Sequence, residues 1–238
     1  MNHHNEFSFS RTAMVCAAIA GAIFTSAPIL AQQKPLVIEP NATGAAAVKA
    51  QSVISKPGSY VLNKNITNTS KNGQDSVAVT APNVTIDLQG FVISATGSNT
   101  GVGINATGQS NVVIRNGIIT GFDGPAIIGG TAANISGITA TGDASAGGGA
   151  SIQAGNGSQI LDNTVTTGGA VGISCLVGCL ARDNVLQANT GFGMTFSDPT
   201  SGYLGNVLQG NSGKTVGTDG QVSGGTSLNQ NLCNGTTC

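Results

Sequence analysis

The sequence contains no tryptophan, few other aromatic residues and very few charged residues. Charged residues are 8% of the 238 residues, which does not suit a helical bundle, because such a bundle needs charged outer faces. Apolar residues are 39%, and with so little charge this is not the composition of a disordered chain. The chain is instead rich in turn formers, with 36 glycines, and in the strand-favouring Val and Ile. The composition therefore predicts an all-β protein, long enough for one domain with a core.

The N-terminus has the order of a secretory signal peptide of bacterial type. Arg11 precedes an apolar run at 12–24, and after a short polar break Ala31 precedes Gln32. This order predicts cleavage after Ala31, so that residues 1–31 are a signal peptide. The apolar run is too short for a comfortable membrane span, although an uncleaved anchor is the alternative. We therefore expect an exported protein, in the periplasm, at the cell surface or in the medium, with no stable membrane span after cleavage.

Cleavage would also remove both histidines, His3 and His4. A mature chain without histidine excludes Ser-His-Asp and Cys-His catalysis and any histidine metal site. The formal net charge of the full chain is −1, so nothing indicates nucleic acid or an anionic membrane as a partner. No cofactor is expected, with Ca²⁺ as the one candidate ion.

Four cysteines remain after cleavage, namely Cys175, Cys179, Cys233 and Cys238. An even number in an exported protein predicts two disulfides, for which three pairings exist. Local pairing, Cys175 with Cys179 and Cys233 with Cys238, is favoured because each pair is close in sequence. A metal site with four thiolates is the alternative, but the spacing within the pairs is not that of the usual zinc sites.

Short apolar segments recur along the chain at a nearly constant spacing. Each unit holds two or three alternating runs separated by Gly, Asn or Ser, as in Asn83-Val-Thr-Ile-Asp87 and Asn111-Val-Val-Ile-Arg115, and this pattern predicts strands. The leading residues of six units are separated by 25, 24, 24, 21 and 21 residues: Val77, Val102, Ala126, Ala150, Val171 and Phe192. Because one unit cannot close a core alone, the repeat predicts stacked coils in which each strand pairs with its counterpart one coil away.

These repeated segments resemble the right-handed parallel β-helix superfamily typified by pectate lyases and polygalacturonases. The resemblance covers roughly residues 55–211 and implies a right-handed parallel β-helix solenoid. A β-sandwich is the alternative fold, but its strands need no constant unit length. Residues 32–54 would then be an extended lead-in and residues 212–238 a C-terminal cap or tail. The Gly-His-Gly segment of polygalacturonases and the Arg-centred segment of pectate lyases are absent, so no catalytic residue of either family carries over.

Asparagines recur with the repeat. Asn163, Asn184 and Asn206 are separated by 21 and 22 residues, and each lies just before an apolar strand. Stacked Asn side chains at a turn can bond from coil to coil, and Asn tolerates left-handed turn geometry. We therefore expect a structural ladder, with a ligand-binding row of asparagines as the alternative.

One polar column falls at equivalent positions of successive units, within one residue of register. Its members are Asp87, Arg115, Ser136, Asp162 and Asp183. Strand alternation should point these side chains outward and place Asp162 and Asp183 about 5 Å apart on adjacent coils. Two such carboxylates could hold Ca²⁺, share a proton or serve glycoside hydrolysis. The alternative is a solvated polar face in which Arg115 and Arg182 offset the acids.

Exposed aromatic rings are the usual platforms for carbohydrate. The candidates after cleavage are Tyr60, Phe91, Phe122, Phe192, Phe196 and Tyr203. We expect Phe192, the leading residue of its coil, to lie in the core. Phe122 and Tyr203 lie near turns and are the residues expected to be exposed.

Three functions fit this inventory. The first is a non-catalytic exported β-helix that binds glycans or builds a surface structure, with Asp87, Arg115, Asp162 and Asp183 as candidate ligand-binding residues. The second is a polysaccharide lyase, hydrolase or epimerase that uses Asp162 and Asp183 with Arg115 or Arg182. The third is an adhesin-like fragment. The poor catalytic inventory favours the first, with a polysaccharide as the expected partner.

Overall fold

The chain folds into strands, turns and bends, and its described residues contain no helix. A computed structural model describes residues 36–38, 52–70, 73–96, 101–142, 149–212 and 221–238, with the backbone alone for 36–38. By its contacts the chain divides into two units, Met1–Gln33 and Lys34–Cys238, and every described residue belongs to the second. The predicted signal peptide, 1–31, lies outside the described residues. The described part contains no helix with the length and apolar character that a membrane span requires.

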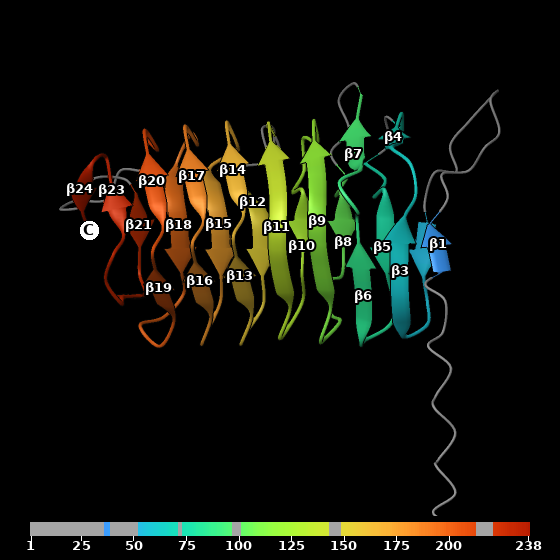
Figure 1. The fold of residues 1–238 in the computed structure, drawn as a ribbon, viewed down its shortest axis with the longest axis horizontal. Coiled ribbons are helices and arrows are strands. Elements are labelled where there is room, and N and C mark those ends of the chain that lie inside the picture. Colours follow the sequence, from blue (N-terminus) through green and yellow to red (C-terminus); the bar gives the residue numbers. More distant parts are fainter. Residues whose placement is uncertain (1–35, 39–51, 71–72, 97–100, 143–148, 213–220) are drawn as a thin grey trace, which may run out of the picture. The chain divides into compact units, whose positions relative to one another are not determined.

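The described strands of the second unit form an 8-stranded and a 16-stranded sheet (Figure 1). The 8-stranded sheet contains, in this order, β2 (Ser52–Ile54), β5 (Val77–Val79), β8 (Ile104–Asn105), β10 (Ile127–Ile128), β12 (Ala150–Ala154), β15 (Val171–Cys175), β18 (Phe192–Phe196) and β21 (Val222–Ser223). The 16-stranded sheet contains β1 (Leu36–Ile38), β3 (Gly58–Leu62), β4 (Ile66–Asn68), β6 (Val84–Asp87), β7 (Val92–Ala95), β9 (Val113–Thr120), β11 (Asn134–Thr141), β13 (Gln159–Leu161), β14 (Thr164–Thr166), β16 (Leu180–Arg182), β17 (Val185–Gln187), β19 (Gly202–Leu204), β20 (Val207–Gln209), β22 (Thr226–Ser227), β23 (Leu232–Cys233) and β24 (Thr236–Thr237).

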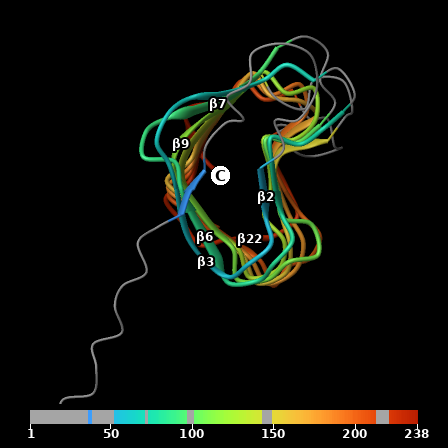
Figure 2. The same ribbon diagram turned by 90° about the vertical axis from the view of Figure 1, so that its right-hand side faces the viewer.

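Strands β1 to β23 pair in parallel with strands one coil away, whereas β24 pairs only with β23, antiparallel and across a short turn. A typical coil places one strand, such as β12, in the 8-stranded sheet and two, such as β13 and β14, in the other. The second unit is therefore a parallel β-solenoid of about 7 turns, whose coils superimpose when viewed along the stack (Figure 2). The predicted fold class is confirmed, and the β-sandwich is excluded because the sheets of a sandwich are antiparallel.

The core consists of ladders of like residues. In the 8-stranded sheet, Ile104, Ile127, Ile152, Ile173 and Met194 follow one another in register, and all are fully buried. Burying one such side chain contributes about 1.5–3 kcal/mol. Because each inward residue packs on its own counterpart one coil away, a repeat in the sequence becomes a continuous core.

The strand ladders extend beyond both ends of the range 55–211. At the start, β1 pairs with β3 and β2 pairs with β5. At the end, β21 continues the 8-stranded sheet from β18, and β23 continues the other sheet from β20. The predicted lead-in and tail therefore both contribute strands to the coils, and the tail repeats the Asn-apolar segment once more as Asn231-Leu-Cys233.

Candidate functional site

The predicted asparagine ladder is present and completely buried. The backbone N and the Nδ2 of Asn163 both donate to Oδ1 of Asn184 at 3.0 Å, and Asn184 donates in the same way to Asn206 at 2.9 and 3.0 Å. Asn231 continues the column by accepting both bonds from Asn206. Each side chain is at most 1% exposed, and Nδ2 also donates to a strand carbonyl of an adjacent coil, such as Ile160 for Asn184. The ladder thus satisfies its own polar groups and offers no surface to a ligand.

A second, shorter ladder was not predicted from the sequence. Nδ2 of Asn189 donates to Oδ1 of Asn211 at 2.7 Å, and Asn211 in turn donates to Oε1 of Gln221 at 2.6 Å. The signal was a repeated pentapeptide, Val185-Leu-Gln-Ala-Asn189 and Val207-Leu-Gln-Gly-Asn211. The two ladders hold the turns on either side of β17 and β20 in a fixed geometry.

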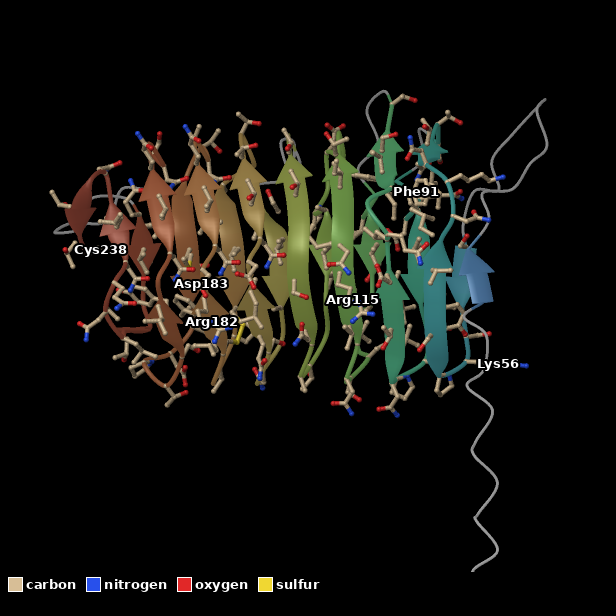
Figure 3. The ribbon with its side chains drawn as sticks, in the orientation of Figure 1. Lys56, Phe91, Arg115, Arg182, Asp183 and Cys238 are labelled. Carbon is tan, nitrogen blue, oxygen red and sulfur yellow. A yellow bond between two sulfur atoms is a disulfide. The ribbon has the colours of Figure 1, made fainter. Side chains whose placement is uncertain are left out.

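The residues of the predicted polar column fall into two groups at different positions of the coils. Asp87, Arg115 and Ser136 lie in direct register on β6, β9 and β11, whereas the next positions are Leu161 and Arg182. Within the column, Nε of Arg115 forms an ion pair with Oδ2 of Asp87 at 2.9 Å, on the outer surface of the 16-stranded sheet (Figure 3). An exposed pair of this kind is worth at most about 1 kcal/mol.

Asp162 and Asp183 lie one residue past this register, at the bend between the two strands of their coils. Their φ angles of 56° and 57° are left-handed, and Gly137 holds the same position one coil earlier with φ of 62°. Such positions favour Gly, Asn and Asp for backbone reasons. The two carboxylates remain on neighbouring coils, since Asp162 N donates to Arg182 O and Asp183 N to Leu204 O.

The surroundings of these two carboxylates differ. Oδ2 of Asp183 pairs with Nε of Arg182 at 3.1 Å, and both side chains are about half exposed (Figure 3). Asp162 is exposed, and its carboxylate forms no hydrogen bond or ion pair with another described residue. No group of three or more His, Cys, Asp or Glu side chains that could hold a metal is found in the described ranges.

The cysteines form the two local disulfides, Cys175–Cys179 and Cys233–Cys238, as favoured from the sequence. Four cysteines in two disulfides leave no thiolates for the alternative metal site. The first disulfide closes a small ring at the end of β15, and Leu176, inside this ring, is 48% exposed. An apolar side chain is therefore held at the surface beside the 8-stranded sheet.

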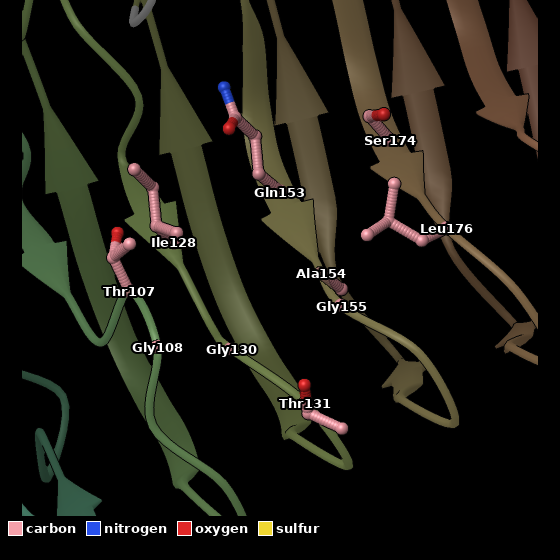
Figure 4. A pocket seen from close by; sticks show the side chains of 10 residues that line it. All are labelled: Thr107, Gly108, Ile128, Gly130, Thr131, Gln153, Ala154, Gly155, Ser174 and Leu176. Carbon is pink, nitrogen blue, oxygen red and sulfur yellow. The ribbon is translucent and has the colours of Figure 1, made fainter.

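A shallow groove lies on the outer face of the 8-stranded sheet and was not predicted. It has a volume of about 260 Å³ and crosses four coils (Figure 4). Its lining residues are Thr107, Gly108, Ile128, Gly130, Thr131, Gln153, Ala154, Gly155, Ser174 and Leu176. Ile128, Gln153 and Ser174 are in register on β10, β12 and β15, so they form one outward row along its length.

Three polar side chains of the groove have unused hydrogen-bonding capacity. Among the described residues, no hydrogen bond is formed by the hydroxyls of Thr131 and Ser174 or by the amide of Gln153. The hydroxyl of Thr107, by contrast, donates to Oδ1 of Asn105 at 2.6 Å. The groove therefore presents neutral donors and acceptors beside two apolar side chains, and the chemistry of this surface suits a ligand with both hydroxyl groups and apolar patches.

The aromatic residues do not form the expected platforms. Phe122 is fully buried and Tyr203 is 9% exposed, so both predictions of exposure are wrong. Tyr203 is in register with the inward Ala181 and stacks on Phe196 with ring centroids 5.7 Å apart. Phe192, predicted to be in the core, is only partly buried. Proximity to a turn was a poor guide, because strand register decides which way a side chain points.

Comparisons of the chain with protein-family models, with curated proteins and with solved structures find no match.

Proposed function

We propose that the protein is an exported, non-catalytic β-helix, of the architecture typified by pectate lyases and polygalacturonases, that binds a polysaccharide in the groove of the 8-stranded sheet. The observation that carries this proposal is the hollow across four coils into which Thr131, Gln153 and Ser174 present unpartnered polar groups. Two disulfides weakly support an oxidising, exported environment.

The groove has the features of a binding surface without catalytic ones. None of its lining residues is ionisable, so it holds no general acid, general base or carboxylate nucleophile. Hydroxyl and amide side chains hydrogen-bond to sugar hydroxyls, and Ile128 and Leu176 can contact the apolar faces of sugar rings. The predicted ligand residues Asp87 and Arg115 lie instead on the 16-stranded sheet and pair with each other.

A polysaccharide binding screen with and without Ca²⁺ tests the proposal. Gln153→Ala combined with Ser174→Ala should abolish retention on the polysaccharides that the parent chain binds. Ser136→Ala is the matched control, because Ser136 is also a partly buried outward serine on a strand but lies on the other sheet. Equal retention of all three proteins would place binding outside the groove.

A second candidate is an enzyme that turns over acidic polysaccharides at Asp162 and Asp183. It is supported by one observation, the position of the two carboxylates at the same bend of neighbouring coils with Arg182 adjacent. Turnover of uronic-acid polymers by the purified protein, lost in Asp162→Ala and retained in Ser174→Ala on the other sheet, would establish an enzymatic activity rather than binding alone.

A further inference from the structure

We infer that the groove binds an uncharged, unbranched polysaccharide strand that lies parallel to the stacking direction of the coils. This inference rests on the proposed function and names the class and orientation of the ligand. It follows from the charge of the groove, its periodicity and the state of the backbone beneath it.

The charge of the groove excludes acidic sugars as its preferred ligand. Ten residues line it, and none carries a charge. Because the groove is shallow, a uronate carboxylate held there would lose only part of its water, but it would gain no cationic partner in return. The two arginines of the described residues, Arg115 and Arg182, lie on strands β9 and β16 of the other sheet. A neutral sugar, whose hydroxyls need only neutral partners, matches the side chains that are present.

The periodicity of the groove favours a polymer aligned with the stack. Ile128, Gln153 and Ser174 occupy the same outward position on three consecutive coils, and Thr107 comes from the coil before them. Coils repeat every ~4.8 Å, so the four coils span roughly 14 Å. A linear chain laid along this row meets one outward side chain on each coil, although the side chain differs from coil to coil, whereas a chain laid across the row would meet the side chains of a single coil.

The backbone under the groove argues against a peptide strand as the ligand. Strand β10 is paired with β8 on one side and β12 on the other, and β12 is paired with β10 and β15. Their main-chain groups are therefore engaged in the ladder, and an added peptide strand would find no free edge to extend. The volume of about 260 Å³ is also small, which suits an unbranched chain.

The test uses isothermal titration of the full exported chain with neutral and acidic hexasaccharides of equal length. The neutral panel contains linear oligomers of glucose, mannose, xylose and N-acetylglucosamine, and the acidic panel contains oligomers of galacturonic and mannuronic acid. At least one neutral hexasaccharide should bind about tenfold more tightly than any acidic one. Its affinity should rise with chain length until the chain spans the four coils and then level off.

Two variants at one position sharpen the result. Gln153→Ala should lower the affinity for the neutral hexasaccharide by about fivefold, because one hydrogen bond to the ligand is lost. Gln153→Lys supplies the cation that the groove lacks, and it should raise the affinity for the galacturonic hexasaccharide. Ser136→Ala, outside the groove, should change neither affinity.

The outcomes separate this inference from the proposed function. If acidic oligomers bind the parent chain more tightly than neutral ones, and if Arg115→Ala rather than Gln153→Ala lowers their affinity, the neutral ligand class is overturned. Polysaccharide binding itself would then still stand. If affinity does not depend on chain length, the proposed orientation is overturned. If no oligosaccharide of either panel binds, the proposed function fails and this inference fails with it.

Discussion

Asn184→Ala removes a central side chain of the asparagine ladder, and we expect it to destabilise the fold by about 4 kcal/mol. The Asn184 side chain takes part in four hydrogen bonds, two accepted from Asn163 and one donated to each of Ile160 and Asn206. A net value of about 1 kcal/mol per bond gives this total. The residue is 0% exposed, so water cannot replace these partners without disturbing the coil.

Urea denaturation followed by circular dichroism measures the effect, and the midpoint should fall by roughly 1 M or more. Asn134→Ala is the matched control, because Asn134 is partly buried and its side chain forms no hydrogen bond with another described residue. The control should change stability by less than about 0.5 kcal/mol. Amide hydrogen exchange should be faster in β13 and β16 of the Asn184 variant. Equal midpoints for the two variants would refute the stabilising role of the ladder.

Three further predictions concern the disulfide, the ion pair and the bend. Cys175→Ala with Cys179→Ala opens a short ring and should lower the free energy of unfolding by about 2 kcal/mol in urea without reductant, and an unchanged midpoint would contradict the loop-closure argument. Asp87→Ala should cost about 1–3 kcal/mol, because the Asp87 side chain is only 18% exposed and accepts bonds from Gln89 N and Asn116 Nδ2 besides its ion pair with Arg115. Only the share due to the ion pair should shrink in high salt, and a loss that high salt abolishes completely would contradict a role for the other bonds. Asp183 has a left-handed φ of 57°, so Asp183→Gly should be tolerated, whereas Asp183→Val should lower the free energy of unfolding by about 1–2 kcal/mol. A lower thermal midpoint for the Gly variant than for the Val variant would show that the carboxylate matters more than the backbone.

The sequence was sufficient to predict the fold because the same physical requirement repeats in every coil. An inward residue such as Ile135 or Ile160 packs on its counterpart, so both positions select an apolar side chain and the spacing becomes visible. The Asn163 column is visible for the same reason, because an amide that bonds to its own copy requires another amide one coil away. The local disulfides followed from the short distance along the chain between their cysteines.

The groove could not be predicted in this way. Its outward row, Ile128, Gln153 and Ser174, has a different residue on each coil, so it leaves no periodic signal. The polar column was predicted to within one residue, but one residue separates Leu161, in direct register with Ser136, from Asp162 at the left-handed bend. A shift of one position in a strand moves a side chain to the other face of the sheet. The alignment of short repeats cannot locate a residue to within one position.

The difference between the repeated inward residues and the variable outward residues indicates which positions can be substituted to change binding without loss of the fold. Residues that point inward or lie in the turns contact the equivalent residues of the adjacent coils. A substitution at Ile152 or Asn184 therefore disturbs two neighbouring coils. Outward residues such as Gln153 and Ser174 lack side-chain partners within the described coils, and substitutions at unpartnered surface positions usually change stability by less than about 0.5 kcal/mol. A loss of binding in a groove variant that keeps its unfolding midpoint would therefore report on the ligand contact itself. The strand ladder fixes the backbone spacing of the outward row before the ligand arrives, so binding has to order only the unpartnered side chains of Gln153 and Ser174.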